Sequence, residues 1–265
     1  MNILIIGRGR VGRALHRSLR SHEQHAVIAA GRRWKSSSVQ RADAVILAVP
    51  DGAIETVAER VARDLSPSAT VLHCAGARGT GELASCERRG AAVGVMHPLV
   101  SFPSKRSNPS LRGTTFTVGG SRRAVATSRR LALACDARIV VAQTGDASYH
   151  AAAALVANGA AALAFVSVGV LERLGFEKRA AERAIGGLLK SVGENVQSLG
   201  VPGALTGPIA RGDTEAVVNH RHALRRVGRD ALPAYDAVVP VIVKCARAAG
   251  LSRVKASKIV GATRE

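Results

Sequence analysis

Short apolar runs alternate with amphipathic stretches along the first half of the chain. Continuous apolar runs of five or six residues are typical of parallel strands that are buried on both faces. The intervening stretches have helical spacing; for example, Val11, Leu15 and Leu19 recur every four residues. Strands separated by helices predict right-handed crossovers and a mostly parallel sheet. The runs that predict strands are residues 2–6, 26–30, 44–49, 70–74, 91–96, 115–119 and 137–142.

The pattern changes after Gly145, because no strand-like run stands out in the remainder of the chain. Residues 147–174 form a long, Ala-rich stretch whose small residues allow close packing, so we expect a helix that is buried on all sides. Residues 205–212 are predicted to form a loop, and Asp213 is placed to cap the helix that follows. The expected helices are residues 147–174, 177–199, 213–228 and 231–249.

This pattern predicts an α/β fold with two domains in the 265 residues. A Rossmann-like, mostly parallel sheet covers residues 1–145, and an all-α domain covers residues 146–265. No apolar run reaches the roughly 18 residues that span a bilayer, and the apolar start reads as a strand rather than an export signal. The four cysteines form no C-x-x-C pair. We therefore expect a cytoplasmic protein in a reducing setting, with no membrane partner.

The chain is strongly basic. Lys and Arg number 38 against 19 Asp and Glu, which gives a net charge of +19, and 31 of the basic residues are arginines. The arginines are spread along the whole chain, with no basic tail and none of the interleaved aromatic residues on which nucleic-acid bases stack. A solvated basic surface that attracts small anions is therefore favoured over a nucleic-acid partner.

A glycine-rich motif, Gly7-Arg8-Gly9-Arg10-Val11-Gly12, follows the first predicted strand and opens the first predicted helix. This is the G-x-G-x-x-G context of dinucleotide binding. Gly7 permits a tight turn, Gly9 lets the backbone approach a pyrophosphate, and Gly12 allows the helix to pack closely on the strand. The free N–H groups of the helix N-terminus favour a bound anion.

The end of the second strand indicates which dinucleotide binds. NAD-binding proteins place an acidic residue there, whereas this chain has Gly31-Arg32-Arg33. Arginines pair with a 2′-phosphate, and Arg8 could join the same pocket, so the sequence predicts NADP. The alternative is that Arg32 and Arg33 are ordinary surface arginines. Val49 and Pro50 end the third strand, where the dinucleotide would cross the sheet edge.

Polar side chains follow two later strands and open the long helix. His73 and His97 lie at the carboxyl ends of their strands, and His150 begins the long helix. Histidines converging there could donate a proton to a carbonyl or imine, and His73 could contact the cofactor. A lone histidine at a strand end more often only hydrogen-bonds a loop carbonyl. They lack local metal-ligand spacing, so we predict no metal site. Asn158, eight residues after His150, could orient a substrate or bond another helix.

Together these motifs resemble a family of Rossmann-like proteins assigned as NADP oxidoreductases, with a helical C-terminal domain of unknown function. More distantly, the chain is similar to ketopantoate reductase, pyrroline-5-carboxylate reductase and the β-hydroxyacid dehydrogenases. The resemblance implies a C-terminal domain like that of 6-phosphogluconate dehydrogenase, and a homodimer. The segments that carry it are Gly7–Gly12, Val49-Pro50-Asp51, His73-Cys74-Ala75-Gly76, His97-Pro98-Leu99, Tyr149-His150-Ala151-Ala152, Asn158 and Leu205–Asp213.

One departure from the related enzymes bears on activity. β-Hydroxyacid dehydrogenases and ketopantoate reductases place a catalytic lysine four residues before an asparagine on the first interdomain helix. Asn158 fits the asparagine, but position 154 is Ala. The leading hypothesis is an NADP-dependent reductase of a small anionic carbonyl or imine, with His150 or His97 as proton donor, Asn158 orienting the substrate and Arg211 holding its anionic group. The alternative is a non-catalytic NADP-binding sensor or partner module.

Overall fold

The computed structural model describes residues 1–22, 24–103, 110–142 and 145–263. The chain forms two compact units, Met1–Ala154 and Leu155–Glu265. The boundary expected near residue 145 lies just before α6 (Ala147–Arg173), whereas the two units divide inside this helix.

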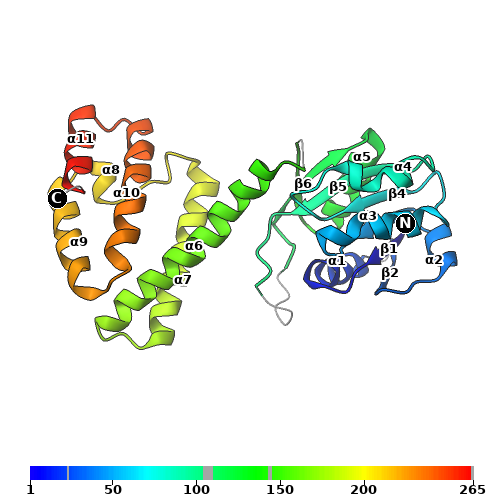
Figure 1. Cartoon of the computed structure of the whole chain (residues 1–265), viewed down its shortest axis with the longest axis horizontal. Coiled ribbons are helices and arrows are strands. Elements are labelled where there is room, and N and C mark those ends of the chain that lie inside the picture. The colour runs from blue at the N-terminus through cyan, green and yellow to red at the C-terminus, as the bar shows by residue number, and fades with distance from the viewer. Residues whose placement is uncertain (23, 104–109, 143–144, 264–265) are drawn as a thin grey trace. The chain divides into compact units, whose positions relative to one another are not determined.

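The first unit contains a seven-stranded sheet in the order β2-β1-β3-β4-β5-β6-β7 (Figure 1). Neighbouring strands are parallel except for β5 and β6, which are antiparallel. The chain leaves β1 for β2 on one side and β3 on the other, so the topological switch point lies between β1 and β3. The strands are β1 (Asn2–Ile6), β2 (Ala26–Ala30), β3 (Ala44–Leu47), β4 (Thr70–His73), β5 (Ala92–Pro98), β6 (Thr115–Gly120) and β7 (Arg138–Val141).

Helices cover both faces of this sheet because its central strands are apolar on both faces. Leu4 and Ile6 of β1 belong to the core that includes α2, α3 and α4. Ile3 and Ile5 belong to the core that includes α1 and α5. The covering elements are α1 (Arg10–Arg20), α2 (Ser36–Gln40), α3 (Ile54–Ala62), α4 (Ala84–Glu87) and α5 (Arg122–Ala134), with short 3₁₀ turns η1 (Asp51–Ala53) and η2 (Thr80–Leu83). The predicted α/β fold class is confirmed.

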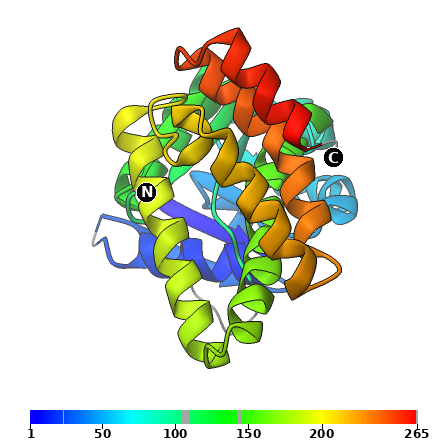
Figure 2. The same cartoon turned by 90° about the vertical axis from the view of Figure 1, so that its left-hand side faces the viewer.

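The second unit is helical, and Figure 2 brings its C-terminal helices to the front. A separate core, including Val217, Val239 and Ile259, joins its last four helices. The short helix α8 lies within residues 205–212, so the prediction of an unbroken loop there is wrong; Pro208 at the first helical position favours this turn. The helices after α6 are α7 (Lys178–Leu199), α8 (Pro208–Arg211), α9 (Thr214–Val227), α10 (Ala231–Ala248) and α11 (Arg253–Ala262).

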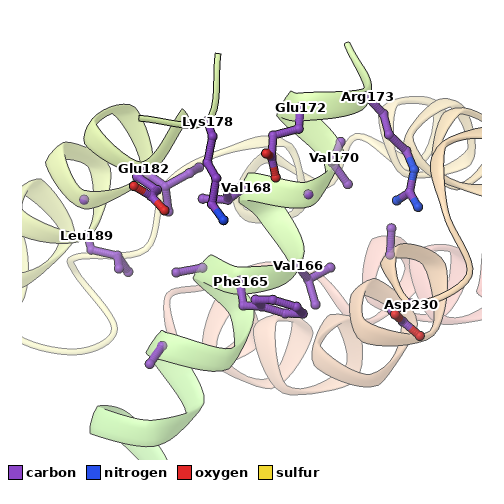
Figure 3. A pocket seen from close by; sticks show the side chains of 16 residues that line it. Phe165, Val166, Val168, Val170, Glu172, Arg173, Lys178, Glu182, Leu189 and Asp230 are labelled. Atoms are coloured by element: carbon purple, nitrogen blue, oxygen red, sulfur yellow. The ribbon is translucent and has the colours of Figure 1, made fainter. Parts of the chain in front are cut away.

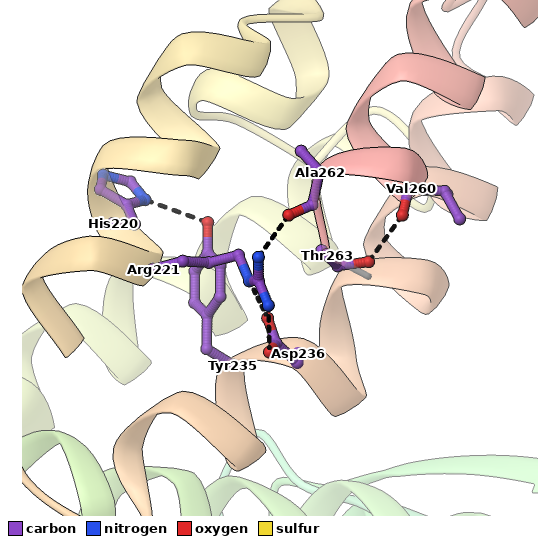
Figure 4. A network of polar contacts seen from close by, with 7 residues as sticks. All are labelled: His220, Arg221, Tyr235, Asp236, Val260, Ala262 and Thr263. Atoms are coloured by element: carbon purple, nitrogen blue, oxygen red, sulfur yellow. Dashed lines mark hydrogen bonds and ion pairs between the residues drawn. The ribbon is translucent and has the colours of Figure 1, made fainter. Parts of the chain in front are cut away.

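A buried arginine ties three of these helices together (Figure 4). Arg221 of α9 donates two hydrogen bonds to the carboxylate of Asp236 on α10, at 2.9 and 3.2 Å. Its remaining terminal nitrogen donates to the carbonyl oxygen of Ala262 on α11. The bidentate geometry pairs a buried charge while leaving few of its donors unsatisfied.

Helix α6 differs from the sequence expectation. It was predicted to be buried on all sides, but none of its residues is buried in the single chain. Its apolar residues extend around the whole circumference. Its most apolar window has a mean hydropathy of 2.0, so by length and composition this helix is capable of crossing a membrane. The expectation that no apolar run reaches that length is therefore wrong, because the window tolerates the isolated polar residues Asn158 and Ser167.

Candidate functional site

The glycine motif forms the turn between β1 and α1. Gly7 has φ +120°, a conformation that side chains strongly disfavour, and a Cβ there would lie 2.1 Å from the carbonyl oxygen of Ala48. A Cβ on Gly12 would lie 2.0 Å from the carbonyl oxygen of Gly7. Gly9 has open space around its Cβ position. Two glycines thus hold the strand and helix together, and the third leaves the backbone accessible to a ligand.

A cavity of about 780 Å³ opens beside this turn, at the carboxyl edge of the sheet. The ends of β1, β3 and β4 contribute to it, which places it across the switch point where ligands bind in doubly wound sheets. Most of the predicted cofactor residues line it, including Arg8, Arg10, Val11, Arg32, Val49 and Pro50. Gly7 and Gly12 lie under the turn, and Arg33 is exposed beside Arg32 without being part of this lining.

The arginines at this end of the sheet are held by backbone and ring contacts. Arg8 donates to the carbonyl oxygen of Ala29 at 3.1 Å. Arg60 donates to the carbonyl oxygen of Arg32 at 3.3 Å, and its guanidinium lies 4.2 Å from the ring centre of Trp34. The loop after β2 is therefore anchored to α3, and the cations of Arg8 and Arg32 face one cavity.

His73, predicted to contact the cofactor, is fully buried. The Ala75 N–H donates to its Nδ1 at 3.2 Å, so its Nε2–H donates to the carbonyl oxygen of Gly79 at 3.0 Å. Burial lowers the pKa of His73, opposed by that second bond and by Glu82 and Asp51, which favours the neutral ring. Both ring nitrogens are occupied, so His73 holds the loop after β4 and leaves no polar atom for a ligand.

His97 lies near the carboxyl end of β5 and contacts Tyr149 of α6. Its Nδ1 lies 2.7 Å from the hydroxyl oxygen of Tyr149 on α6, and the two rings meet edge to face with centroids 5.6 Å apart. Gly76 packs against the imidazole, since a Cβ there would lie 2.9–3.1 Å from three of its ring atoms. Gly76 follows Ala75, which lines the cavity, so the imidazole packs on the residue next to the cavity wall.

The surroundings of His97 favour a neutral ring. Burial lowers the pKa of His97 most, His150 and His73 lower it further, and Asp51 opposes them. His150 itself is exposed. Cys74 lines the cavity, and burial raises the pKa of its thiol to about 12, so the thiol is protonated. Among the residues that the structure describes, no group of His, Cys, Asp and Glu could hold a metal ion.

Tyr149 was missed as a site residue by the sequence reasoning, which took its segment only as part of the family resemblance. A signal was present, because the chain has only two tyrosines and this one immediately precedes His150. The contact with His97 joins residues 52 positions apart, and no local pattern predicts it.

The remaining predicted residues belong to the second unit. Asn158 and Arg211 are both exposed, and the carbonyl oxygen of Arg211 accepts a bond from Lys255 at 3.4 Å. Their roles toward a substrate stay predictions. The predicted cap is confirmed: the side chain of Asp213 accepts from the N–H of Ala216 at 3.0 Å and begins α9.

A second cavity, of about 790 Å³, lies within the second unit between α6 and α7 and the start of α10 (Figure 3). Its walls are mainly apolar, and the labelled side chains include Phe165, Val166 and Leu189. Charged side chains also line it, with Lys178 and Glu182 on one side and Arg173 and Asp230 on the other. The larger part of its wall is apolar contact area.

Comparison with known proteins places this site in context. Residues 114–240 match the profile of a domain of unknown function, DUF2520. A protein from Bacteroides fragilis provisionally named NADP oxidoreductase is 19% identical, with a TM-score of 0.66 over 92% of this chain and 98% of its own. No curated protein matches the sequence.

Two further solved structures share the fold across nearly the whole chain. An imine reductase of Streptomyces aurantiacus is 13% identical, with a TM-score of 0.64 over 98% of this chain and 99% of its own. A pyrroline carboxylate reductase of Plasmodium falciparum, solved with NADP bound, is 13% identical, with a TM-score of 0.60 over 99% and 98%. The predicted resemblance is confirmed, and at these identities the likeness establishes the fold.

Proposed function

We propose that this protein is an NADP-dependent reductase of a small anionic carbonyl or imine compound. The observation that carries the proposal is the cavity at the switch point, where an accessible glycine turn and the cations of Arg8 and Arg32 meet. Bound NADPH would supply a hydride at this edge of the sheet.

The residues present fit this cofactor in three respects. Gly9 leaves the turn open to a pyrophosphate, and the first N–H groups of α1 face it with a positive helix end. Arg8 and Arg32 suit a 2′-phosphate, and no acidic side chain stands at the end of β2 to repel one. Val49 and Pro50 would lie along the dinucleotide as it crosses the edge. The similar reductase of Plasmodium falciparum binds NADP, which supports the same assignment.

The substrate class is inferred from charge and from the related folds. A net charge of +19 favours an anionic compound, and similar folds are named imine and pyrroline carboxylate reductases. The ring of His97 packs against Gly76, next to the cavity-lining Ala75, and His150 is close enough to lower the pKa of His97. We infer that these groups can deliver a proton to the reduced heteroatom. We infer that this edge, rather than the apolar cavity of the second unit, is the reacting centre.

A direct test measures NADPH oxidation by the full-length protein against a panel of small keto acids, cyclic imines and their uncharged analogues. The proposal predicts turnover with at least one anionic member and weaker turnover with its uncharged analogue. NADPH binding without turnover on any member would favour the alternative, a non-catalytic NADP-binding module. This alternative rests on the alanine at position 154, where related enzymes have a catalytic lysine.

We also propose that the protein is a homodimer through α6 and α7. An apolar helix with no buried residue requires a cover, and the groove beside Phe165 continues the apolar surface. Phe165 is 78% exposed and Leu155 is 76% exposed. A second copy of the same surface is the cover that the chain itself can supply.

A further inference from the structure

Each of the chain's two tyrosines is paired with a histidine in the same way. Tyr149 bonds Nδ1 of His97 at 2.7 Å, and Tyr235 bonds Nδ1 of His220 at 3.0 Å. Both pairs are edge to face, with ring centroids 5.6 and 5.8 Å apart. The first pair belongs to the same edge of the sheet as the glycine turn, because His97 packs on Gly76 next to the cavity-lining Ala75. The second joins α9 and α10 in the helical unit (Figure 4).

We propose that Tyr149 is the proton donor of the reaction and that His97 is the positioning residue that aims its hydroxyl group. This inference rests on the proposed function, because it assigns the step that completes the reduction. It differs from the expectation that a histidine donates directly, and it accounts for the lack of a lysine at position 154.

The geometry gives the phenol a fixed place. Tyr149 is the third residue of α6 and half-buried, and its hydroxyl is held by a residue at the carboxyl end of β5. His97 is in turn seated against Gly76, one residue beyond the cavity wall at Ala75. The phenol is therefore tied to the same edge at which the cofactor is expected to bind.

The tautomer of His97 decides which way the phenol proton points. If Nδ1 carries the hydrogen, it donates to the Tyr149 oxygen and leaves the O–H free for a substrate. The groups near the imidazole are His150, His73 and Asp51. Burial of the ring, His150 and His73 lower the pKa of His97, and Asp51 opposes them. The net lowering favours a neutral ring with one N–H to offer and one nitrogen to accept.

The step balances without a further reagent. The substrate carbon receives a hydride with its two electrons from the reduced nicotinamide, and the π bond to nitrogen or oxygen breaks. The heteroatom takes the proton of the Tyr149 O–H bond. The phenolate is then reprotonated from bulk solvent, which supplies the one proton that the overall reduction consumes, and His97 keeps its Nδ1 hydrogen throughout.

The test compares Tyr149→Phe with Tyr235→Phe, a matched loss of one hydroxyl from an equivalent pair. A positioned general acid contributes about 100- to 10,000-fold, so kcat should fall at least about 100-fold in Tyr149→Phe and stay within about twofold in Tyr235→Phe. NADPH binding, measured by calorimetry, should be unchanged in both. A Tyr149→Phe enzyme with the native kcat would overturn the inference.

A second substrate separates proton donation from a structural role. An N-alkylated iminium ion accepts a hydride without needing a proton, so Tyr149→Phe should reduce it at nearly the native rate. Equal loss of rate on the neutral imine and the iminium ion would mean that Tyr149 only shapes the site, which overturns the inference. No turnover by the native protein would instead contradict the proposed function.

The role of His97 is tested by two variants. His97→Asn retains an amide group near the position of Nδ1, whereas His97→Ala retains none. We expect His97→Ala to lower kcat about 10-fold or more with little change in KM, to shift the alkaline limb of the kcat–pH profile, and to be partly rescued by His97→Asn. Equal kcat in all three proteins would contradict the positioning role.

Discussion

The Cα of Gly12 faces the carbonyl oxygen of Gly7 so closely that a Cβ would lie 2.0 Å from it. The same turn leaves Gly9 with open space. The motif therefore combines two positions that determine folding with one that determines binding, and these roles can be separated by experiment.

Gly12→Ala should destabilise the first unit, because the methyl group would collide with the backbone of Gly7 and crowd the side chain of Ala48. We expect a loss of about 2 kcal/mol or more in the free energy of unfolding. Gly9→Ala should unfold like the native protein but bind NADPH at least about 10-fold more weakly, since its methyl group would occupy the space of the pyrophosphate. The stability of both variants is measured as Tm by calorimetry, and their affinity for NADPH by titration. Equal losses of Tm in the two variants would refute the claim that Gly12 determines folding and Gly9 determines binding.

Removing one partner of the buried pair between Arg221 and Asp236 should destabilise the helical unit. Asp236→Ala leaves a buried guanidinium uncompensated, which costs about 3 kcal/mol. Arg229→Ala, at an exposed position in the connection between α9 and α10, should cost less than about 0.5 kcal/mol. Urea unfolding followed by far-UV circular dichroism measures both, and a stable Asp236→Ala protein would contradict the role of this network in joining the three helices.

Stability should fall as the pH drops below about 6.5. The pKa values of His73 and His97 are lowered by burial, so between each folded pKa and the unfolded value near 6.5 the unfolded chain binds more protons. The free energy of unfolding therefore rises with pH through this window and levels off above it. Urea unfolding at pH 5 to 8 should show this slope, and His73→Gln should reduce it; an unfolding free energy that increases toward pH 5 would refute the assignment.

Charged substitutions on α6 should abolish the proposed homodimer. Leu155→Lys combined with Phe165→Lys places two cations on the most exposed apolar positions, and we expect a monomer in sedimentation analysis where the native protein is a dimer. Val254→Lys, an equally exposed apolar position on α11, is the matched control and should remain dimeric. A native protein that sediments as a monomer without detergent, or that partitions into lipid vesicles, would contradict the proposal.

The sequence predicts local features of this protein better than contacts between distant segments. The seven strands follow their apolar runs, and the central strands β1, β3 and β4 bury both faces. The glycine turn is identified by its place between a strand and a helix. Two features depend on how loops meet at the sheet edge, which hydrophobic periodicity does not encode. They are the contact of Tyr149 with His97 and the hydrogen bonds made by both ring nitrogens of His73. The exposure of α6 was missed because apolar residues around a whole helix indicate that the helix is covered, but they do not indicate which surface covers it.

The central claim is that the glycine turn and its arginines form an NADP site. Calorimetric titration of the purified protein with NADPH and with NADH tests it most directly. The account predicts that NADPH binds at least about 10-fold more tightly than NADH, and that Arg32→Ser removes most of this difference, because the guanidinium pairs with the 2′-phosphate. Binding of neither dinucleotide, or equal binding of both, would contradict it.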